Sequence, residues 1–157
     1  MRLVILAVGR MKSGPERELV ARYVTRAEQS GRALGLSGCE VIELRESRAS
    51  SSDRRKLEEA EAIRARIPES SRILAFDERG RTADSGDFAG LIKTARDAGR
   101  TAFACIIGGP DGLDPSLARD AVAFGRLVMP HQLVRILVAE QLYRATTILA
   151  GHPYHRV

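Results

Sequence analysis

The sequence lacks every feature that would tie the chain to a membrane or a secretory route. It has no uncharged apolar run of about 18 residues, the length that a membrane-spanning helix needs. The apolar stretch at residues 3–8 is too short for a signal peptide, and no small-residue cleavage site follows it. No repeat, linker or low-complexity tract divides the chain. We therefore expect a cytoplasmic protein without a membrane partner, folded as one domain over residues 1–157.

Cysteine is scarce as well. Cys39 and Cys105 are the only two, and they stand far apart in apolar segments. Neither belongs to a spacing of metal-ligating residues, so we expect no metal site. Two buried free thiols fit the reducing cytoplasm.

Lysine is nearly absent from a basic chain. Of the 25 basic residues only Lys12, Lys56 and Lys93 are lysines, and the formal net charge is +5. A positive charge carried by arginine favours a polyanionic partner, because the planar guanidinium binds phosphate and base edges through paired hydrogen bonds. A coding bias toward arginine explains the same composition, and both interpretations stay open.

What the sequence does contain is a regular alternation of apolar runs and helical patterns. Strands are predicted at 3–8, 39–44, 73–76 and 101–107, and the first is almost entirely aliphatic, as in strands buried on both faces. Residues 77–80 are predicted to turn, residues 115–123 to form a short helix after Asp114, and residues 124–129 to be a fifth strand or an extended loop. The pattern predicts an α/β fold, with a mainly parallel sheet and helices on both faces.

A glycine-rich segment, Gly108 to Gly112, follows the fourth predicted strand. It matches neither the phosphate loop that ends in Lys-Ser or Lys-Thr nor the GxGxxG dinucleotide fingerprint. A plain strand-to-helix turn is one interpretation, but three glycines and a proline within five residues favour a loop whose bare amides a ligand approaches. Ligands of parallel sheets bind beyond the carboxyl ends of the strands, where this segment lies.

The last thirty residues combine a long apolar helix with all the histidines of the chain. The helix is predicted over residues 132–150, with Gly151 as its end, and it is apolar on most sides. Such a helix packs against the sheet and a second copy of the chain, or it is a core helix carrying a Glu140–Arg144 ion pair. His131 precedes it as either a structural cap or a site residue, and His152 and His155 follow it in a short tail.

The chain resembles the RlmH (YbeA) family within the SPOUT methyltransferase superfamily, over its whole length. The resemblance is carried by Leu6-Ala7-Val8-Gly9, Asp77, Gly80, Ile107-Gly108-Gly109-Pro110-Asp111-Gly112-Leu113, Met129-Pro130-His131, Leu133-Val134-Arg135, Val138-Ala139-Glu140-Gln141-Leu142-Tyr143-Arg144-Ala145 and His152-Pro153-Tyr154-His155-Arg156. It implies a C-terminal trefoil knot and a homodimer. It also implies a methyltransferase that acts on N3 of a pseudouridine in large-subunit ribosomal RNA, within the assembled ribosome.

The resemblance further implies S-adenosylmethionine as methyl donor, S-adenosylhomocysteine as product and no metal. The cofactor-binding positions carried over are Phe76, Gly108, Phe124, Gly125, Arg126, Leu127, Val128 and Met129. Two of these positions depart from the family's pattern. Phe76 replaces an aliphatic residue, and the segment 124–126 replaces a small polar run.

The tail carries the candidate catalytic side chains. The imide proton on N3 must leave, which a base or donors that stabilise the imide anion would assist. The candidates are His152, Tyr154, His155 and Arg156. An ordinary disordered terminus is the alternative interpretation of the tail. For the whole chain, the alternatives are a non-catalytic RNA-binding module that retains the knotted fold and an enzyme using another adenosine-type ligand.

Overall fold

Five strands form one parallel sheet in the computed structural model, which describes residues 1–154. The strands are β1 (Arg2–Val8), β2 (Cys39–Leu44), β3 (Arg72–Thr82), β4 (Ala102–Ile107) and β5 (Ala121–Ala123), in the order β2-β1-β4-β3-β5. The pairs β1–β2, β1–β4, β3–β4 and β3–β5 are all parallel. The central strand β4 is buried at every position, in keeping with its continuous apolar sequence.

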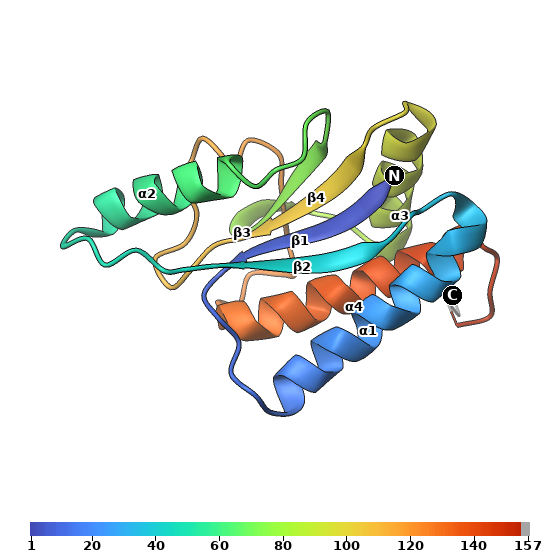
Figure 1. The fold of residues 1–157 in the computed structure, drawn as a ribbon, viewed down its shortest axis with the longest axis horizontal. Helices are drawn as coiled ribbons and strands as arrows, with labels where there is room; N and C mark the ends of the chain where they lie inside the picture. The colour runs from blue at the N-terminus through green and yellow to red at the C-terminus, as the bar shows by residue number, and fades with distance from the viewer. Residues whose placement is uncertain (155–157) are drawn as a thin grey trace.

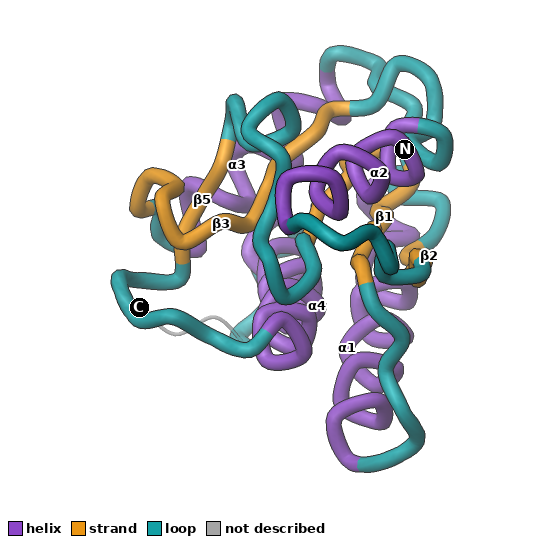
Figure 2. Tube along the Cα trace, turned by 90° about the vertical axis from the view of Figure 1, so that its left-hand side faces the viewer, coloured by secondary structure: helices purple, strands orange, loops and turns teal. Residues whose placement is uncertain are grey.

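Helices cover both faces of this sheet. Three of them, α1 (Pro15–Gly31), α3 (Ser85–Asp97) and α4 (His131–Leu149), pack with a 3-10 turn (Arg32–Leu34) on the face that buries Leu3, Ile5 and Ala7 of β1. The helix α2 (Ser52–Arg64) packs on the other face, against Val4, Leu6 and Val8. Figure 1 shows α2 across the sheet from α1 and α4, and Figure 2 shows α1 and α4 side by side. The predicted fold class is confirmed, whereas the trefoil knot stays a prediction.

The prediction of a turn at residues 77–80 is wrong, because β3 continues to Thr82 and pairs with β5 after an irregularity between Phe76 and Arg81. Gly80 makes this possible. A Cβ on Gly80 would lie 2.6 Å from the carbonyl carbon of Val122, so only glycine lets the two backbones come this close. The second half of β3 is largely exposed and its residues are mostly polar, so its sequence resembles that of a turn.

The predicted helix at residues 115–123 is also wrong. Asp114 does begin a turn, since its carboxylate accepts a hydrogen bond from the amide of Ser116 at 2.9 Å and its carbonyl accepts one from Leu117 at 3.0 Å. The chain then leaves the turn, and Ala121–Ala123 pair with β3 as β5. The pairing of these residues with β3 therefore outweighs the tendency of Asp114-Pro115 to begin a helix. Among residues 1–154, no helix is long and apolar enough to cross a membrane.

Candidate active site

A cavity of about 460 Å³ opens at the carboxyl ends of β4 and β5, beside the irregular middle of β3. Three segments enclose it: Phe76–Arg79, the glycine-rich loop with its flanks at residues 107–113, and the segment that follows β5. The first turn of α4 contributes His131 and Val134, and α2 contributes Lys56. The three segments come from distant parts of the sequence. The parallel sheet brings them together, because β4 and β5 end beside the point where the pairing of β3 becomes irregular.

Seven of the eight predicted cofactor positions line this cavity. They are Phe76, Gly108, Phe124, Gly125, Leu127, Val128 and Met129. Arg126 is exposed and does not line the cavity. Asp77 and Asp111, which carry part of the resemblance without a predicted role, also line the cavity, and so do Lys56, Glu78 and Arg79, which the sequence analysis did not single out.

The glycine-rich loop folds back on itself at the end of β4. Gly109 and Gly112 form an antiparallel bridge, in which the amide of Gly112 donates to the carbonyl of Gly109 at 3.0 Å. A Cβ on Gly108 would lie 2.8 Å from the carbonyl carbon of Gly112, and Gly112 itself has a φ of +85°. No helix follows the loop, so the interpretation as a strand-to-helix turn is wrong. The loop is a closed wall whose own geometry requires glycine.

Two aromatic residues that depart from the family's pattern meet in the cavity wall. The rings of Phe76 and Phe124 are stacked, with centroids 5.2 Å apart and planes inclined by 18°. Phe88 of α3 contacts Phe76 edge-on, with centroids 6.1 Å apart. The two replacements therefore support each other, since each ring supplies a packing surface for the other.

Large apolar side chains are left exposed beside this wall. Leu127 is 78% exposed and Val128 is 82% exposed, and both line the cavity. Exposed aliphatic side chains that converge on an open cavity are typical of a site that a partly apolar ligand covers.

The carboxylates of the cavity are held by arginines. Asp77 accepts hydrogen bonds from Nε and Nη2 of Arg79 at 3.0 and 3.2 Å and from the amide of Arg79 at 2.9 Å. These bonds keep the pKa of the Asp77 carboxyl below its usual range. Arg55 lowers the pKa of Asp111 in the same way, through two hydrogen bonds. Both groups are therefore ionised near neutral pH.

A buried arginine fixes the start of α4 against the end of β1. Arg135 is 1% exposed and donates to Glu43 at 2.6 Å and to the carbonyl of Gly9 at 2.8 Å. The ring of His131 lies beside Gly9, where a Cβ would be 3.4 Å from its Nε2 atom. The N-cap of α4 is Pro130, without a side-chain cap, so the interpretation of His131 as a structural cap is wrong. His131 instead faces the cavity, and Arg135, which carries part of the resemblance, had no predicted role.

The described part of the tail, residues 152–154, lies at the opposite end of α4 from the cavity. The hydroxyl of Tyr154 donates to Glu140 at 3.2 Å, and its ring packs on Tyr143 with centroids 4.7 Å apart. Burial, followed by the charge of Glu140, raises the pKa of Tyr154. His152 is exposed and accepts a hydrogen bond from the amide of Tyr154 at 3.1 Å. The other two candidate catalytic residues, His155 and Arg156, lie outside the described residues.

Comparison with known proteins gives one consistent result. A family model described as "Predicted SPOUT methyltransferase" matches residues 1–155. Among similar proteins, one from Beijerinckia indica is 53% identical and one from a Bradyrhizobium species is 54% identical, with at least 98% of each chain covered. A protein of Rhizobium rhizogenes is 51% identical over the full length of both chains. All three carry the name "Ribosomal RNA large subunit methyltransferase H".

Proposed function

This chain belongs to the SPOUT methyltransferase family, and we propose that it transfers a methyl group from S-adenosylmethionine to ribosomal RNA of the large subunit. The acceptor is N3 of a pseudouridine, as the resemblance to the RlmH family implies. The observation that carries the proposal is the cavity at the carboxyl edge, because its lining contains seven of the eight positions carried over from the family. The site of action is the cytoplasm, where ribosomes lie.

The residues of the cavity fit the donor. Its volume of about 460 Å³ lies within the range of small-molecule sites. The exposed side chains of Leu127 and Val128 offer an apolar cover for an adenosine moiety, and the glycine-rich loop offers backbone amides and carbonyls. When bound, the donor supplies a methyl group activated by a positively charged sulfonium sulfur. The carboxylates of Asp77 and Asp111 line the same space, and each is paired with an arginine.

Methyl transfer requires little covalent chemistry from the protein itself. It is an in-line displacement, so the main task of the chain is to hold donor and acceptor in register and to exclude water. The bridged glycine-rich loop and the stacked rings of Phe76 and Phe124 form a rigid wall of the cavity. Removing the imide proton is then the one acid–base step, and it falls to the tail.

The roles within the tail differ with the chemistry of its side chains. A raised pKa keeps the Tyr154 hydroxyl protonated at neutral pH, so it serves as a hydrogen-bond donor and not as a base. Imidazole is the ordinary acceptor of a proton near neutrality, which assigns that step to His152 or His155. Arg156 suits the stabilisation of an imide oxyanion or the binding of a phosphate.

Geometry supports a homodimer in which the tail serves the other subunit. From His131 to Ala150 the helix rises roughly 28 Å, at 1.5 Å per residue. The five residues from His152 to Arg156 span at most roughly 18 Å when fully extended. A tail that starts at the far end of α4 is therefore too short to return to its own cavity. A second copy of the chain removes this difficulty, and it also covers the side chain of Leu133, which is 47% exposed.

The proposal is tested by a methyl-transfer assay with labelled S-adenosylmethionine. We expect label in large-subunit RNA when assembled 70S particles lacking the modification are supplied, and less label with free RNA. Digestion and mass spectrometry should locate the methyl group on a pseudouridine. RNA binding without any transfer would favour the non-catalytic alternative, and transfer that depends on a different donor would favour the third.

Unpaired cations at the carboxyl edge support an RNA substrate. Arg10 and Lys12 follow β1, and Arg45 follows β2 directly. Within residues 1–154 their side chains form no ion pair or hydrogen bond. Asp77 and Asp111, at the same edge, are already paired with arginines. We call these three cations the positive rim; together with the carboxylates of Glu46 and Glu78 at the same edge, which are unpaired within the described residues, they leave an excess of positive charge, which suits a phosphate backbone.

Neutralising this rim should weaken RNA binding without affecting the fold. We expect the triple variant Arg10→Gln, Lys12→Gln and Arg45→Gln to bind large-subunit RNA at least roughly tenfold more weakly. The slope of log affinity against log salt should also fall by about two, because each lost phosphate contact removes about 0.7–0.9. The control removes the same charge at the amino edge, in Arg66→Gln, Arg100→Gln and Arg119→Gln. Equal losses in the two triple variants would mean that net charge, and not this rim, attracts the RNA.

A further inference from the structure

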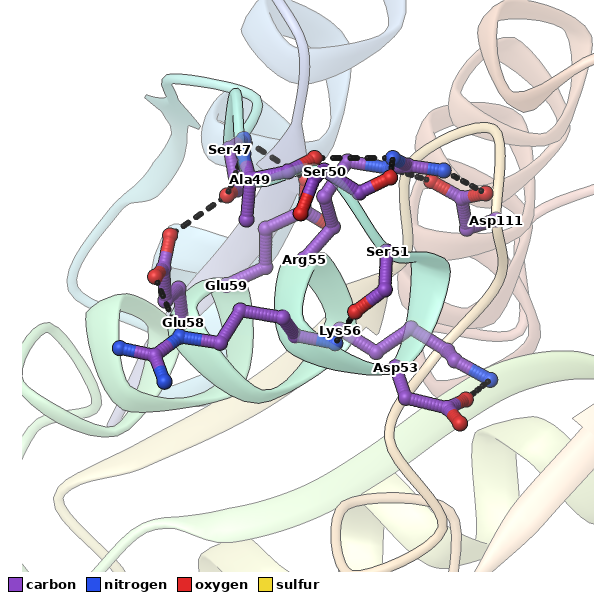
Figure 3. Close-up of polar contacts among 11 residues, drawn as sticks. Ser47, Ala49, Ser50, Ser51, Asp53, Arg55, Lys56, Glu58, Glu59 and Asp111 are labelled. Carbon is purple, nitrogen blue, oxygen red and sulfur yellow. Dashed lines mark hydrogen bonds and ion pairs between the residues drawn. The ribbon is translucent and has the colours of Figure 1, made fainter.

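The guanidinium of Arg55 joins α2 and the loop that precedes it to the glycine-rich loop, which lies 56 residues further along the sequence. From α2 it donates to both carboxylate oxygens of Asp111 in the glycine-rich loop, at 2.7 and 2.9 Å. Its third nitrogen donates to the carbonyls of Ala49 and Ser50 at 2.9 and 3.3 Å. Ala49 and Ser50 belong to the loop that joins β2 to α2, residues 45–51. Figure 3 shows this bridge, with Arg55 between the two loops.

The ion pair of Arg55 and Asp111 is partly shielded from water, and its geometry suits arginine rather than lysine. The side chains of Arg55 and Asp111 are 29% and 26% exposed, so the pair is less screened by water than the exposed pairs of the same helix. A planar guanidinium can place two parallel hydrogen bonds on one carboxylate and a third on nearby carbonyls. A lysine ammonium at the same position would supply the charge but not this arrangement.

A second attachment lies one helical turn further along α2. Glu59 is 5% exposed and accepts a hydrogen bond from the amide of Ser47 at 2.9 Å. Its other carboxylate oxygen lies 3.3 Å from the position that a Cβ of Gly109 would occupy. Arg55 and Glu59 are four residues apart, so one face of α2 binds the loop at residues 45–51 at two points and the glycine-rich loop at one, through Asp111.

We propose that Arg55 is a positioning residue for the donor site, because it holds the glycine-rich loop in the shape that forms the cavity wall. Gly108 to Gly112 all line the cavity, and Asp111 is the residue through which α2 fixes them. The loop at residues 45–51 lies on the outer side of this bridge, and Arg55 couples it to the wall. This inference rests on the proposed function, since it takes the cavity as the site of S-adenosylmethionine.

Donor affinity measured by calorimetry tests the inference. We expect Arg55→Ala to weaken S-adenosylmethionine binding about tenfold, and Arg55→Lys to weaken it nearly as much, because charge alone does not restore the paired bonds. Asp111→Ala should behave like Arg55→Ala, and the double variant should lose no more than either single one. In the methyl-transfer assay the KM for the donor should rise while kcat at saturating donor stays unchanged.

The neighbouring arginine provides the matched control. Arg54 lies on the same turn of α2, and its ion pair with Glu58 is exposed and does not touch the glycine-rich loop. Arg54→Ala should change donor affinity less than about twofold. A folded Arg55→Ala variant with the affinity of the wild type would overturn the inference, as would strictly additive losses in the double variant.

Hydrogen exchange separates this inference from the proposed function. The amide of Gly112 is bonded to Gly109 within the loop, so its exchange reports whether the loop is closed. It should exchange faster in Arg55→Ala and Arg55→Lys than in Arg54→Ala, with no donor present. Unchanged exchange would contradict the positioning role, whatever the protein binds. A wild type that binds no S-adenosylmethionine, with exchange that still responds to Arg55, would refute the proposed function alone.

Discussion

Gly108→Val is expected to weaken S-adenosylmethionine binding by at least roughly a hundredfold, which corresponds to about 2.8 kcal/mol. A Cβ at this position would lie 2.8 Å from the carbonyl carbon of Gly112, 2.9 Å from its oxygen and 3.0 Å from Cγ of Leu113. Backbone atoms cannot rotate away as a flexible side chain can, so the loop has to open. Opening it breaks the hydrogen bond from Gly112 to Gly109 and moves the wall of the cavity.

The clash lies within the protein and does not depend on the donor. Bare backbone for a ligand to approach, which the sequence pattern favours, is therefore not the first reason for glycine at position 108. The main core should survive the substitution, because Gly108 follows the last residue of β4 and does not pair in the sheet. We expect the variant to keep its far-ultraviolet circular dichroism and its assembly state while it loses donor binding in calorimetry.

A glycine in α3 serves as control for the substitution. Gly90 is exposed within the helix, and nothing lies within 4 Å of the Cβ that it would gain. Gly90→Ala should bind the donor as the wild type does and gain up to about 1 kcal/mol of stability from helix propensity. If Gly108→Val binds the donor with wild-type affinity, the glycine-rich loop does not belong to the donor site.

The sheet was predictable from the sequence wherever strands are buried on both sides. The runs at 3–8 and 101–107 are continuously apolar, and β1 and β4 take those positions to within one residue. The second half of β3 was missed because its largely exposed residues, from Asp77 to Thr82, carry no apolar pattern. The segment 115–123 was misassigned because Asp-Pro marks the start of a helix, and pairing with a distant strand decided its structure. Local signals cannot report such pairing.

The candidate site, like the sheet, could be predicted from the sequence only in part. Resemblance located the three loops of the cavity, but the bonds that hold them were not visible in the sequence. Arg55 and Asp111 are 56 residues apart and Arg135 and Glu43 are 92 residues apart, and no periodicity links them. The stacked pair of Phe76 and Phe124 shows the same limit, because two separate departures from a pattern have one physical cause only in three dimensions. Long-range polar and aromatic pairs depend on the tertiary fold, which the pattern does not encode position by position.

A chain that ends at Gly151 is expected to stay folded, to bind S-adenosylmethionine and to lose methyl transfer by roughly a hundredfold or more, the effect typical of a lost general base. Gly151 has a φ of +66° and its amide donates to Ile148 at 3.1 Å, so the helix ends there by itself. The truncation removes the contacts of Tyr154 with Glu140 and Tyr143, which together contribute about 1–2 kcal/mol of stability. Thermal unfolding should register this small loss.

A full-length Tyr154→Ala variant separates the anchor from the chemistry. It loses the packing on Tyr143 but keeps the histidines and the arginine of the tail. We expect it to unfold at nearly the same temperature as the truncated chain and to retain more activity. Equal activity in the two variants would mean that Tyr154 alone accounts for the contribution of the tail. Full activity of the truncated chain would mean that the tail is an ordinary terminus.

Mixing experiments then decide which subunit the tail serves. The truncated chain has intact loops and no tail, and full-length Gly108→Val has a tail and a defective loop. In a heterodimer whose tails cross, one pocket combines the intact loops of the first chain with the tail of the second, so about half the wild-type rate per dimer should return. The crossing is the arrangement we propose, because the tail reaches roughly 18 Å when extended and α4 is roughly 28 Å long. A verified heterodimer that remains inactive would show that each tail acts on its own subunit, and α4 would then have to be shorter or bent when the enzyme works.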